Sequence, residues 1–131
     1  MKAVGKFAEN VLKTLVSGLN DVGDHKKVDQ SGGAFMAVCV EFVGKCKLGD
    51  LFSVAHYYEQ NGDLMRDPEM VFLRGADGRF YPTYFRQDGG LCIEQESADV
   101  EKGTFRPAMQ AEHASFAGLW MKNIREQQHL F

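Results

Sequence analysis

Five runs of aromatic and β-branched residues, separated by short links, constrain the fold of this chain more than any other feature. The links hold only a few residues and are rich in glycine, aspartate and asparagine. A parallel crossover needs a dozen or more residues, so the runs are expected to pair as neighbouring antiparallel strands. The sequence therefore predicts a five-stranded antiparallel meander with strands at 34–44, 51–60, 69–75, 79–87 and 91–97.

An amphipathic helix is expected on each side of these strands. Apolar residues recur every three or four positions from Val4 to Leu19. A second helix opens at Pro107, and its buried side is marked by Met109, Phe116, Trp120 and Ile124. The stretches 24–33 and 97–106 are polar and predict loops. We therefore expect a single α+β domain over residues 1–131, with both helices packed on one face of the sheet.

The second face of the sheet is predicted to need a cover. In the runs 69–75 and 79–87, apolar residues point to both faces, whereas two helices cover only one. Pro82 cannot donate to a strand ladder, which predicts a bulge or an edge position there. Large contiguous apolar patches are uncommon on monomers. We therefore expect the second face to meet a loop, a ligand, a second copy in a homodimer or another protein partner.

Charge and composition narrow the classes of function. The chain has 15 basic and 18 acidic residues and a net charge of −3, so it lacks the basic excess that supplies most non-specific nucleic-acid affinity. No run approaches the roughly 20 apolar residues of a membrane span, and no signal peptide is visible, which predicts a cytoplasmic protein without a membrane contact. The three cysteines have no CxxC spacing and are expected to be reduced and mostly buried. No phosphate-binding or dinucleotide motif occurs, and no cofactor is expected.

The segment "HYYEQNGDLMRDPEM" (56–70) holds the densest set of chemically capable side chains. Asn61-Gly62 is a strong hairpin turn signal, and the residue before Pro68 is biased to an extended conformation, so a rigid turn explains the segment. In this interpretation His56 bonds a backbone carbonyl or a tyrosine hydroxyl. The alternative is a metal-dependent or hydrolytic enzyme in which the carboxylates and the histidine converge on a ligand. The candidate residues, functional or structural, are His56, Tyr58, Asp63, Arg66, Asp67 and Glu69.

A second alternative is a surface that stacks single-stranded nucleic acid. Arginines alternate with aromatic residues along the later strands, as such surfaces require. The residues concerned are Arg74, Arg79, Arg86 and Arg106 with Phe80, Tyr81, Tyr84 and Phe85. Solvated hairpin charges beside core aromatics explain the same pattern, and the net negative charge disfavours nucleic-acid binding.

Residues 34–97 carry His-Tyr-Tyr, Asn-Gly-Asp and Asp-Pro-Glu elements within "VAHYYEQNGDLMRDPEMVF", followed by "DGRFYPTYFRQD". With these elements the chain resembles a family of short uncharacterised domains encoded on plasmids, phages and integrative elements of bacteria. The resemblance implies a mobile-element context and supplies no catalytic residues. The leading hypothesis is therefore a non-enzymatic binding or accessory module of a mobile genetic element.

Overall fold

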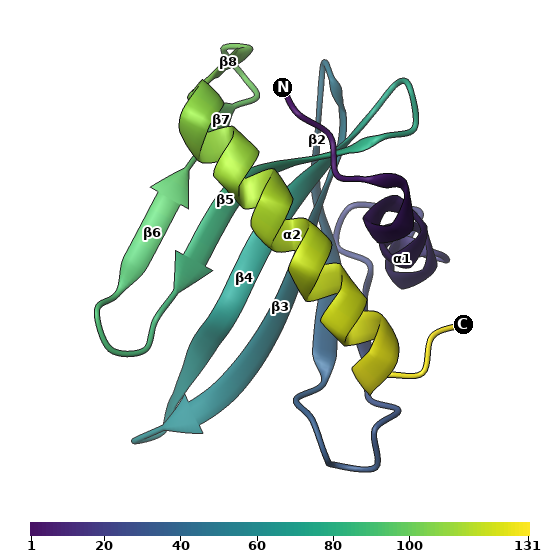
Figure 1. Cartoon of the computed structure of the whole chain (residues 1–131), viewed down its shortest axis with the longest axis vertical. Helices are drawn as coiled ribbons and strands as arrows, with labels where there is room; N and C mark the ends of the chain where they lie inside the picture. The colour runs from purple at the N-terminus through teal and green to yellow at the C-terminus, as the bar shows by residue number, and fades with distance from the viewer.

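The computed structural model describes residues 1–131, which form an open antiparallel sheet carrying two long helices (Figure 1). The strands follow one another across the sheet in chain order, and every neighbouring pair is antiparallel. They are β1 (His25–Val28), β2 (Val38–Cys46), β3 (Gly49–Gln60), β4 (Asp63–Gly75), β5 (Phe80–Gln87) and β6 (Ile93–Glu96). The predicted meander is confirmed, but the prediction of five strands is wrong because the sheet has six.

The additional strand, β1, lies in the stretch 24–33 that was predicted as a loop. It pairs with β2 from His25↔Glu41 to Val28↔Val38 and forms one edge of the sheet. Charged residues, lysine especially, are common on edge strands. Such a strand has no apolar alternation, so the sequence gives no strand signal for it.

The hairpin between β3 and β4 is tighter than predicted. Asn61 and Gly62 have φ values of 52° and 82°, as expected for the two central residues of the predicted turn. Strand β4 begins directly afterwards at Asp63 rather than at residue 69. The pairing shifts register between Ala55 and Tyr57, whose partners are Glu69 and Arg66. Strand β4 therefore has one extra residue at this point, which is a β-bulge beside the cis Asp67–Pro68 peptide bond.

The helices are α1 (Lys6–Val16) and α2 (Pro107–Gln127), and both lie on the same face of the sheet (Figure 1). Helix α1 is shorter than the predicted Val4–Leu19 span, although both of these end residues are buried beside it. Phe116 was predicted on the buried side of the second helix, α2, but it is 38% exposed, so this prediction is wrong. The shared core combines α1, α2 and the inward residues of the sheet, among them Leu12, Leu15, Val40, Phe42, Phe52, Val54, Met70, Phe72, Phe80, Met121 and Ile124.

The opposite face of the sheet has no helix over it, and we call it the open face. A small hairpin of β7 (Ala98–Asp99) and β8 (Thr104–Phe105), in the stretch predicted as a loop, follows β6. Cavities near it are lined by Met1, Leu48 and hairpin residues together with open-face side chains, and the open-face Leu73 is only 2% exposed. The chain's own loops therefore crowd one end of the open face and leave the other end free.

The structure also tests the predictions for Pro82 and for the three cysteines. Strand β5 carries a bulge at Pro82, because Val71 pairs with Tyr84 and the adjacent Phe72 pairs with Pro82. Of the two positions predicted for this proline, the structure selects the bulge. The cysteines are all free, but Cys92 is exposed and Cys39 and Cys46 are half-buried, so the prediction that they are mostly buried is wrong.

Candidate functional site

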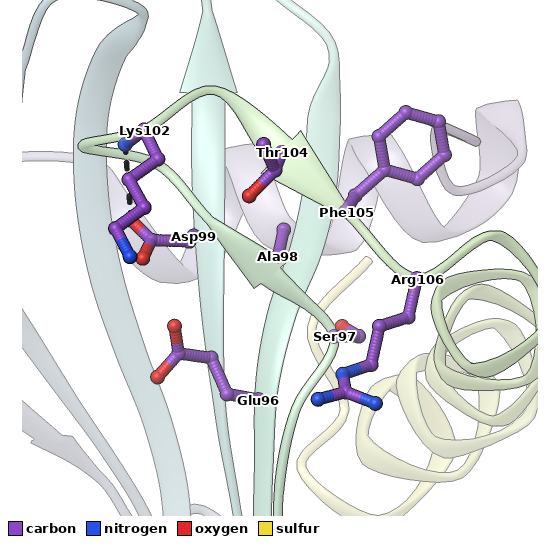
Figure 2. A pocket seen from close by; sticks show the side chains of 8 residues that line it. All are labelled: Glu96, Ser97, Ala98, Asp99, Lys102, Thr104, Phe105 and Arg106. Atoms are coloured by element: carbon purple, nitrogen blue, oxygen red, sulfur yellow. Dashed lines mark hydrogen bonds between the residues drawn. The ribbon is translucent and has the colours of Figure 1, made fainter.

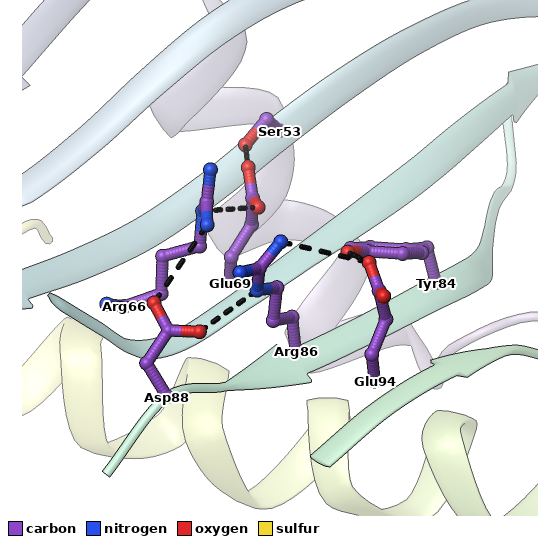
Figure 3. Close-up of polar contacts among 7 residues, drawn as sticks. All are labelled: Ser53, Arg66, Glu69, Tyr84, Arg86, Asp88 and Glu94. Carbon is purple, nitrogen blue, oxygen red and sulfur yellow. Dashed lines mark hydrogen bonds and ion pairs between the residues drawn. The ribbon is translucent and has the colours of Figure 1, made fainter. Parts of the chain in front are cut away.

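A network of charged side chains occupies the middle of the open face (Figure 3). Four neighbouring strands and the loop after β5 supply its members. They are Ser53 on β3, Arg66 and Glu69 on β4, Tyr84 and Arg86 on β5, Asp88 directly after β5, and Glu94 on β6. Cross-strand register brings them together, since Glu69 pairs with Arg86 and Arg86 pairs with Glu94. We call this set the open-face network.

Glu69 is the centre of the network on β4. Its Oε2 accepts a hydrogen bond from the Ser53 hydroxyl at 2.6 Å. Its Oε1 lies 3.0 Å from Arg66 Nε, but the buried Nε–H makes no hydrogen bond, so this contact is an ion pair. Residues three apart on a regular strand point to opposite faces. Arg66 and Glu69 share the open face because the bulge at Asp67 and Pro68 inserts an extra residue between them.

Asp88 links the network to the loop after β5. Its Oδ2 accepts from the Arg66 backbone N–H at 2.9 Å, and its own N–H donates to the Arg66 carbonyl at 3.0 Å. Its Oδ1 accepts from Arg86 Nε at 2.8 Å. The hydrogen bonds from the Arg66 backbone, and next from the Arg86 side chain, hold the pKa of Asp88 below its usual range. This carboxylate therefore fixes both the bulge in β4 and the direction of the Arg86 side chain.

Arg86 and Tyr84 both meet Glu94 on the edge strand. Arg86 Nη1 lies 3.6 Å from Glu94 Oε2, and the Tyr84 hydroxyl donates to the same oxygen. The bond to Asp88, and next the contact with Tyr84, raises the pKa of Arg86 further above its usual value. The Arg86 and Arg66 side chains remain 32% and 34% exposed. Both guanidinium groups are thus held in place while part of each faces solvent.

Tyr57 borders the network opposite Arg66 and is half-buried. Burial, and next the negative charge of Glu69, raises the pKa of the Tyr57 hydroxyl above its usual value. On the same face, burial raises the pKa of the Cys39 thiol. Neither group is therefore activated as a nucleophile or base at neutral pH.

The structure places the six candidates from the segment 56–70 on different surfaces. His56 is buried on the helix side, where Nδ1 lies 3.0 Å from the Ala37 carbonyl oxygen and the ring meets Trp120 edge-on. Tyr58 reaches the loop after β5, since a Cβ at position 89 would lie 2.6 Å from its hydroxyl oxygen.

The carboxylates of the segment also separate. Asp63 is exposed at the hairpin tip. Asp67 accepts from Gln87 Nε2 at 3.0 Å. Only Arg66 and Glu69 contact each other. No three metal-ligating side chains come together anywhere in the chain.

Sequence reasoning missed Ser53, Arg86, Asp88 and Glu94 as members of one site. These residues come from four separate segments, and no motif links them. The available signal was the strand alternation that places Glu69, Arg86 and Glu94 on one face of a meander. Finding the network from the sequence would also have required the bulge in β4, which brings Arg66 to that face.

A buried serine and histidine pair lies at the start of α2. His113 Nδ1 is 2.8 Å from Ser97 Oγ, and His113 Nε2 is 2.9 Å from Gln95 Oε1. Burial lowers the pKa of His113. Ser97 also borders a cavity of about 480 Å³ between Glu96, Asp99, Lys102 and Arg106 (Figure 2). However, Ser97 is 0% exposed, so no substrate reaches its hydroxyl, and the pair connects β6 and β7 to α2.

The arginine and aromatic residues proposed as a nucleic-acid surface are divided between the two faces. Arg74 lies on the helix side, donates to Asp50 at 2.8 Å and lies over the Phe52 ring. Phe80 is fully buried, and Phe85 packs against Phe116 on the helix side. Arg86 is on the open face and is paired with carboxylates. A continuous stacking surface with free cations is therefore not formed.

Comparisons with known proteins give one match. A family model described as a domain of unknown function (DUF6908) matches residues 6–130. No curated protein and no solved structure matches the chain. Neither helix is long and apolar enough to span a membrane.

Proposed function

The chain belongs to the DUF6908 family of domains of unknown function, and we propose that it is a non-enzymatic binding module that engages a protein partner through its open face. The observation that carries this proposal is the fixed, half-exposed set of tyrosine and arginine side chains around the open-face network. The partner is a second copy or another protein. The face has the chemistry of a recognition surface.

Tyrosine and arginine dominate the binding energy of protein interfaces because they combine large apolar area with directional hydrogen bonding. On the open face, Tyr57 and Tyr84 flank Arg66 and Arg86 on adjacent strands. Val71, which pairs with Tyr84, adds a half-buried apolar side chain to this face. Ordering flexible side chains on binding costs free energy, and arginines already held by Asp88 and Glu69 avoid part of that cost.

The charge balance of the open face favours protein over nucleic acid. Each guanidinium in the network has a carboxylate partner within 3.0 Å. A phosphate backbone would meet Glu69, Asp88 and Glu94 together with the arginines. A protein surface presenting both signs of charge and apolar groups matches this face better.

The proposed cellular setting is the cytoplasm of a bacterium, on a mobile genetic element in which the protein serves as an accessory factor. Its support is the resemblance carried by the His-Tyr-Tyr, Asn-Gly-Asp and Asp-Pro-Glu elements. The gene neighbourhoods of DUF6908 members test it. Members spread evenly through chromosomal housekeeping regions would contradict this part of the proposal.

Affinity capture from the native host with matched baits tests the binding function. The native chain is compared with a Tyr57→Ala/Tyr84→Ala variant and with a control, Phe7→Ala, which truncates an exposed aromatic residue on α1. We expect one or more proteins to be retained by the native chain and the control and lost from the double variant. Identical retention by all three baits would refute the open face as the binding surface. Mass measurement of the purified chain shows whether the partner is a second copy.

A further inference from the structure

The two edges of the sheet carry opposite charges. Edge strand β1 has the sequence His-Lys-Lys-Val, and edge strand β6 has Ile-Glu-Gln-Glu. Lys27 and Glu96 are exposed, and neither forms an ion pair within the chain. Ile93 is 42% exposed at the β6 edge. Each edge thus presents unpaired side chains together with the free backbone groups of an edge strand.

We propose that copies of this chain associate head to tail, with β6 of one copy pairing antiparallel with β1 of the next. This contact uses the edges and is independent of the proposed open-face function. Strand direction alternates regularly from β1 to β6. A second β1 therefore enters antiparallel to β6 when both copies have the same orientation, with their helices on the same face.

One register places complementary side chains opposite each other across this junction. It places Ile93 opposite Val28, Glu94 opposite Lys27, Gln95 opposite Lys26, and Glu96 opposite His25. Within one copy, Lys27 and His25 lie on the open face through their pairing with Cys39 and Glu41. Glu94 and Glu96 lie on the same face through their pairing with Arg86 and Tyr84. Directly opposite residues of an antiparallel pair share a face, so Glu94 meets the opposite charge of Lys27, Glu96 meets the His25 ring, and the exposed isoleucine gains an apolar neighbour.

Symmetric pairing of like edges is disfavoured by the same side chains. If the helices stay on one face, two β6 edges place Glu94 opposite Glu96. Two β1 edges place Lys27 opposite His25 and Lys26 opposite Lys26. Like charges directly opposite destabilise a strand pair. The edges therefore select the head-to-tail contact, which does not close at two copies and generates a series of larger species.

The helices leave room for this contact. Helix α1 packs on β2 and helix α2 packs on β5. From β5 of one copy to β2 of the next there are three strand spacings, or about 14 Å, and packed helices need only about 8–10 Å between axes. Adjacent copies can therefore continue the sheet without a clash between their helices.

Light scattering coupled to size exclusion, at rising protein concentration and low salt, tests the proposal. We expect the average mass of the native chain to rise above the 14.7 kDa monomer and to pass twice that value without a plateau. Added salt should reverse the rise, because the paired charges are near the surface. A native chain that stays at the monomer mass up to its solubility limit, or stops at the dimer, would overturn the proposal.

A charge-swap experiment tests the register. Lys27→Glu and Glu94→Lys are each expected to weaken association by about tenfold or more, since each creates a like-charge pair across the junction. An equimolar mixture should regain association, because each variant presents an edge that matches the other. Lys122→Glu and Glu59→Lys are the controls, as they make the same charge changes at exposed residues away from both edges.

Glu94→Lys also loses the contacts of Glu94 with Tyr84 and Arg86. Glu96→Lys serves as the second variant, because it places a lysine opposite His25 and disturbs no ion pair in its own copy. Circular dichroism confirms that each variant is folded. Controls that lose association like the edge variants, or folded edge variants that associate like the native chain, would refute the proposed junction.

Discussion

Removing the Ser53 hydroxyl is the most direct test of the open-face network. Ser53 is 5% exposed and donates to the Glu69 carboxylate at 2.6 Å. A hydrogen bond to a charged acceptor contributes about 1.5–3 kcal/mol. The lower end of this range applies, because Glu69 retains its Arg66 contact and is 17% exposed, so water replaces part of the lost bond. Ser53→Ala should therefore lower the free energy of unfolding by about 1.5 kcal/mol.

The corresponding change in melting temperature follows from chain length. For 131 residues, an unfolding entropy of about 2.1 cal/mol/K per residue gives roughly 0.28 kcal/mol/K. A loss of about 1.5 kcal/mol then lowers Tm by about 5 °C. Differential scanning fluorimetry or calorimetry measures this shift. Ser115→Ala is the control, since Ser115 is exposed on α2 and its hydroxyl has no partner.

A double-mutant cycle separates the hydrogen bond from other effects of the substitution. Glu69→Gln removes the charge, and Ser53→Ala is then measured in that background. If the hydroxyl acts through the Glu69 carboxylate, the two changes should couple by about 1 kcal/mol or more. Additive changes, or a Ser53→Ala protein that melts within 1 °C of the native chain, would refute the network geometry.

Three further results are expected. Gln128 is fully buried, and its amide accepts from the Gln30 N–H at 2.6 Å and donates to the Met36 carbonyl at 3.1 Å, so Gln128→Ala should cost about 2 kcal/mol and speed hydrogen exchange at Gln30. Burial lowers the pKa of His113 in the folded state, so as pH falls the His113 ring takes up a proton in the unfolded chain before it does so in the folded chain. Stability should therefore decrease below the usual histidine pKa, and His113→Gln should remove that part of the pH slope in urea titrations. Tyr57, Tyr81 and Tyr84 each have a raised pKa, so spectroscopic titration of Tyr57→Phe should lose one of these raised transitions and keep the other two, whereas an unchanged curve would contradict the position of Tyr57 beside Glu69.

Much of the fold follows from local patterns in the sequence. Alternation in the run 34–44 predicts Met36, Val38, Val40 and Phe42 as the core side. The last three are buried because β2 is buried on one face only, whereas Met36 precedes the strand and is 39% exposed. Asn61-Gly62 gives a two-residue turn because both residues readily adopt positive φ. The short links leave antiparallel pairing as the simple topology. These elements are determined by residues close together in the sequence, so local sequence patterns are enough to predict them.

The candidate site depends on register, which the sequence does not reveal. Spacing alone separates Arg66 from Glu69 to opposite faces, and a single extra residue in β4 reverses that result. Asp88 lies in a turn signal, yet its carboxylate caps the backbone of Arg66 on another strand. Strand β1 shows the same limit, since a charged edge strand and a polar loop have similar composition. Long-range pairing determines each of these features.

The two proposals together predict how binding depends on assembly. Head-to-tail pairing would align successive open faces on one side of a continuous sheet, so an immobilised partner would meet several binding sites at once. Linked sites raise apparent affinity without any new contact, commonly by about 10²-fold or more. Lys27→Glu should therefore weaken binding to a densely immobilised partner but leave binding to the same partner free in solution unchanged. Tyr57→Ala/Tyr84→Ala should weaken both. If Lys27→Glu lost the same affinity for the immobilised partner and for the partner in solution, the β1 edge would contact the partner directly. The proposal that the edges serve self-association and the open face serves partner binding would then be wrong.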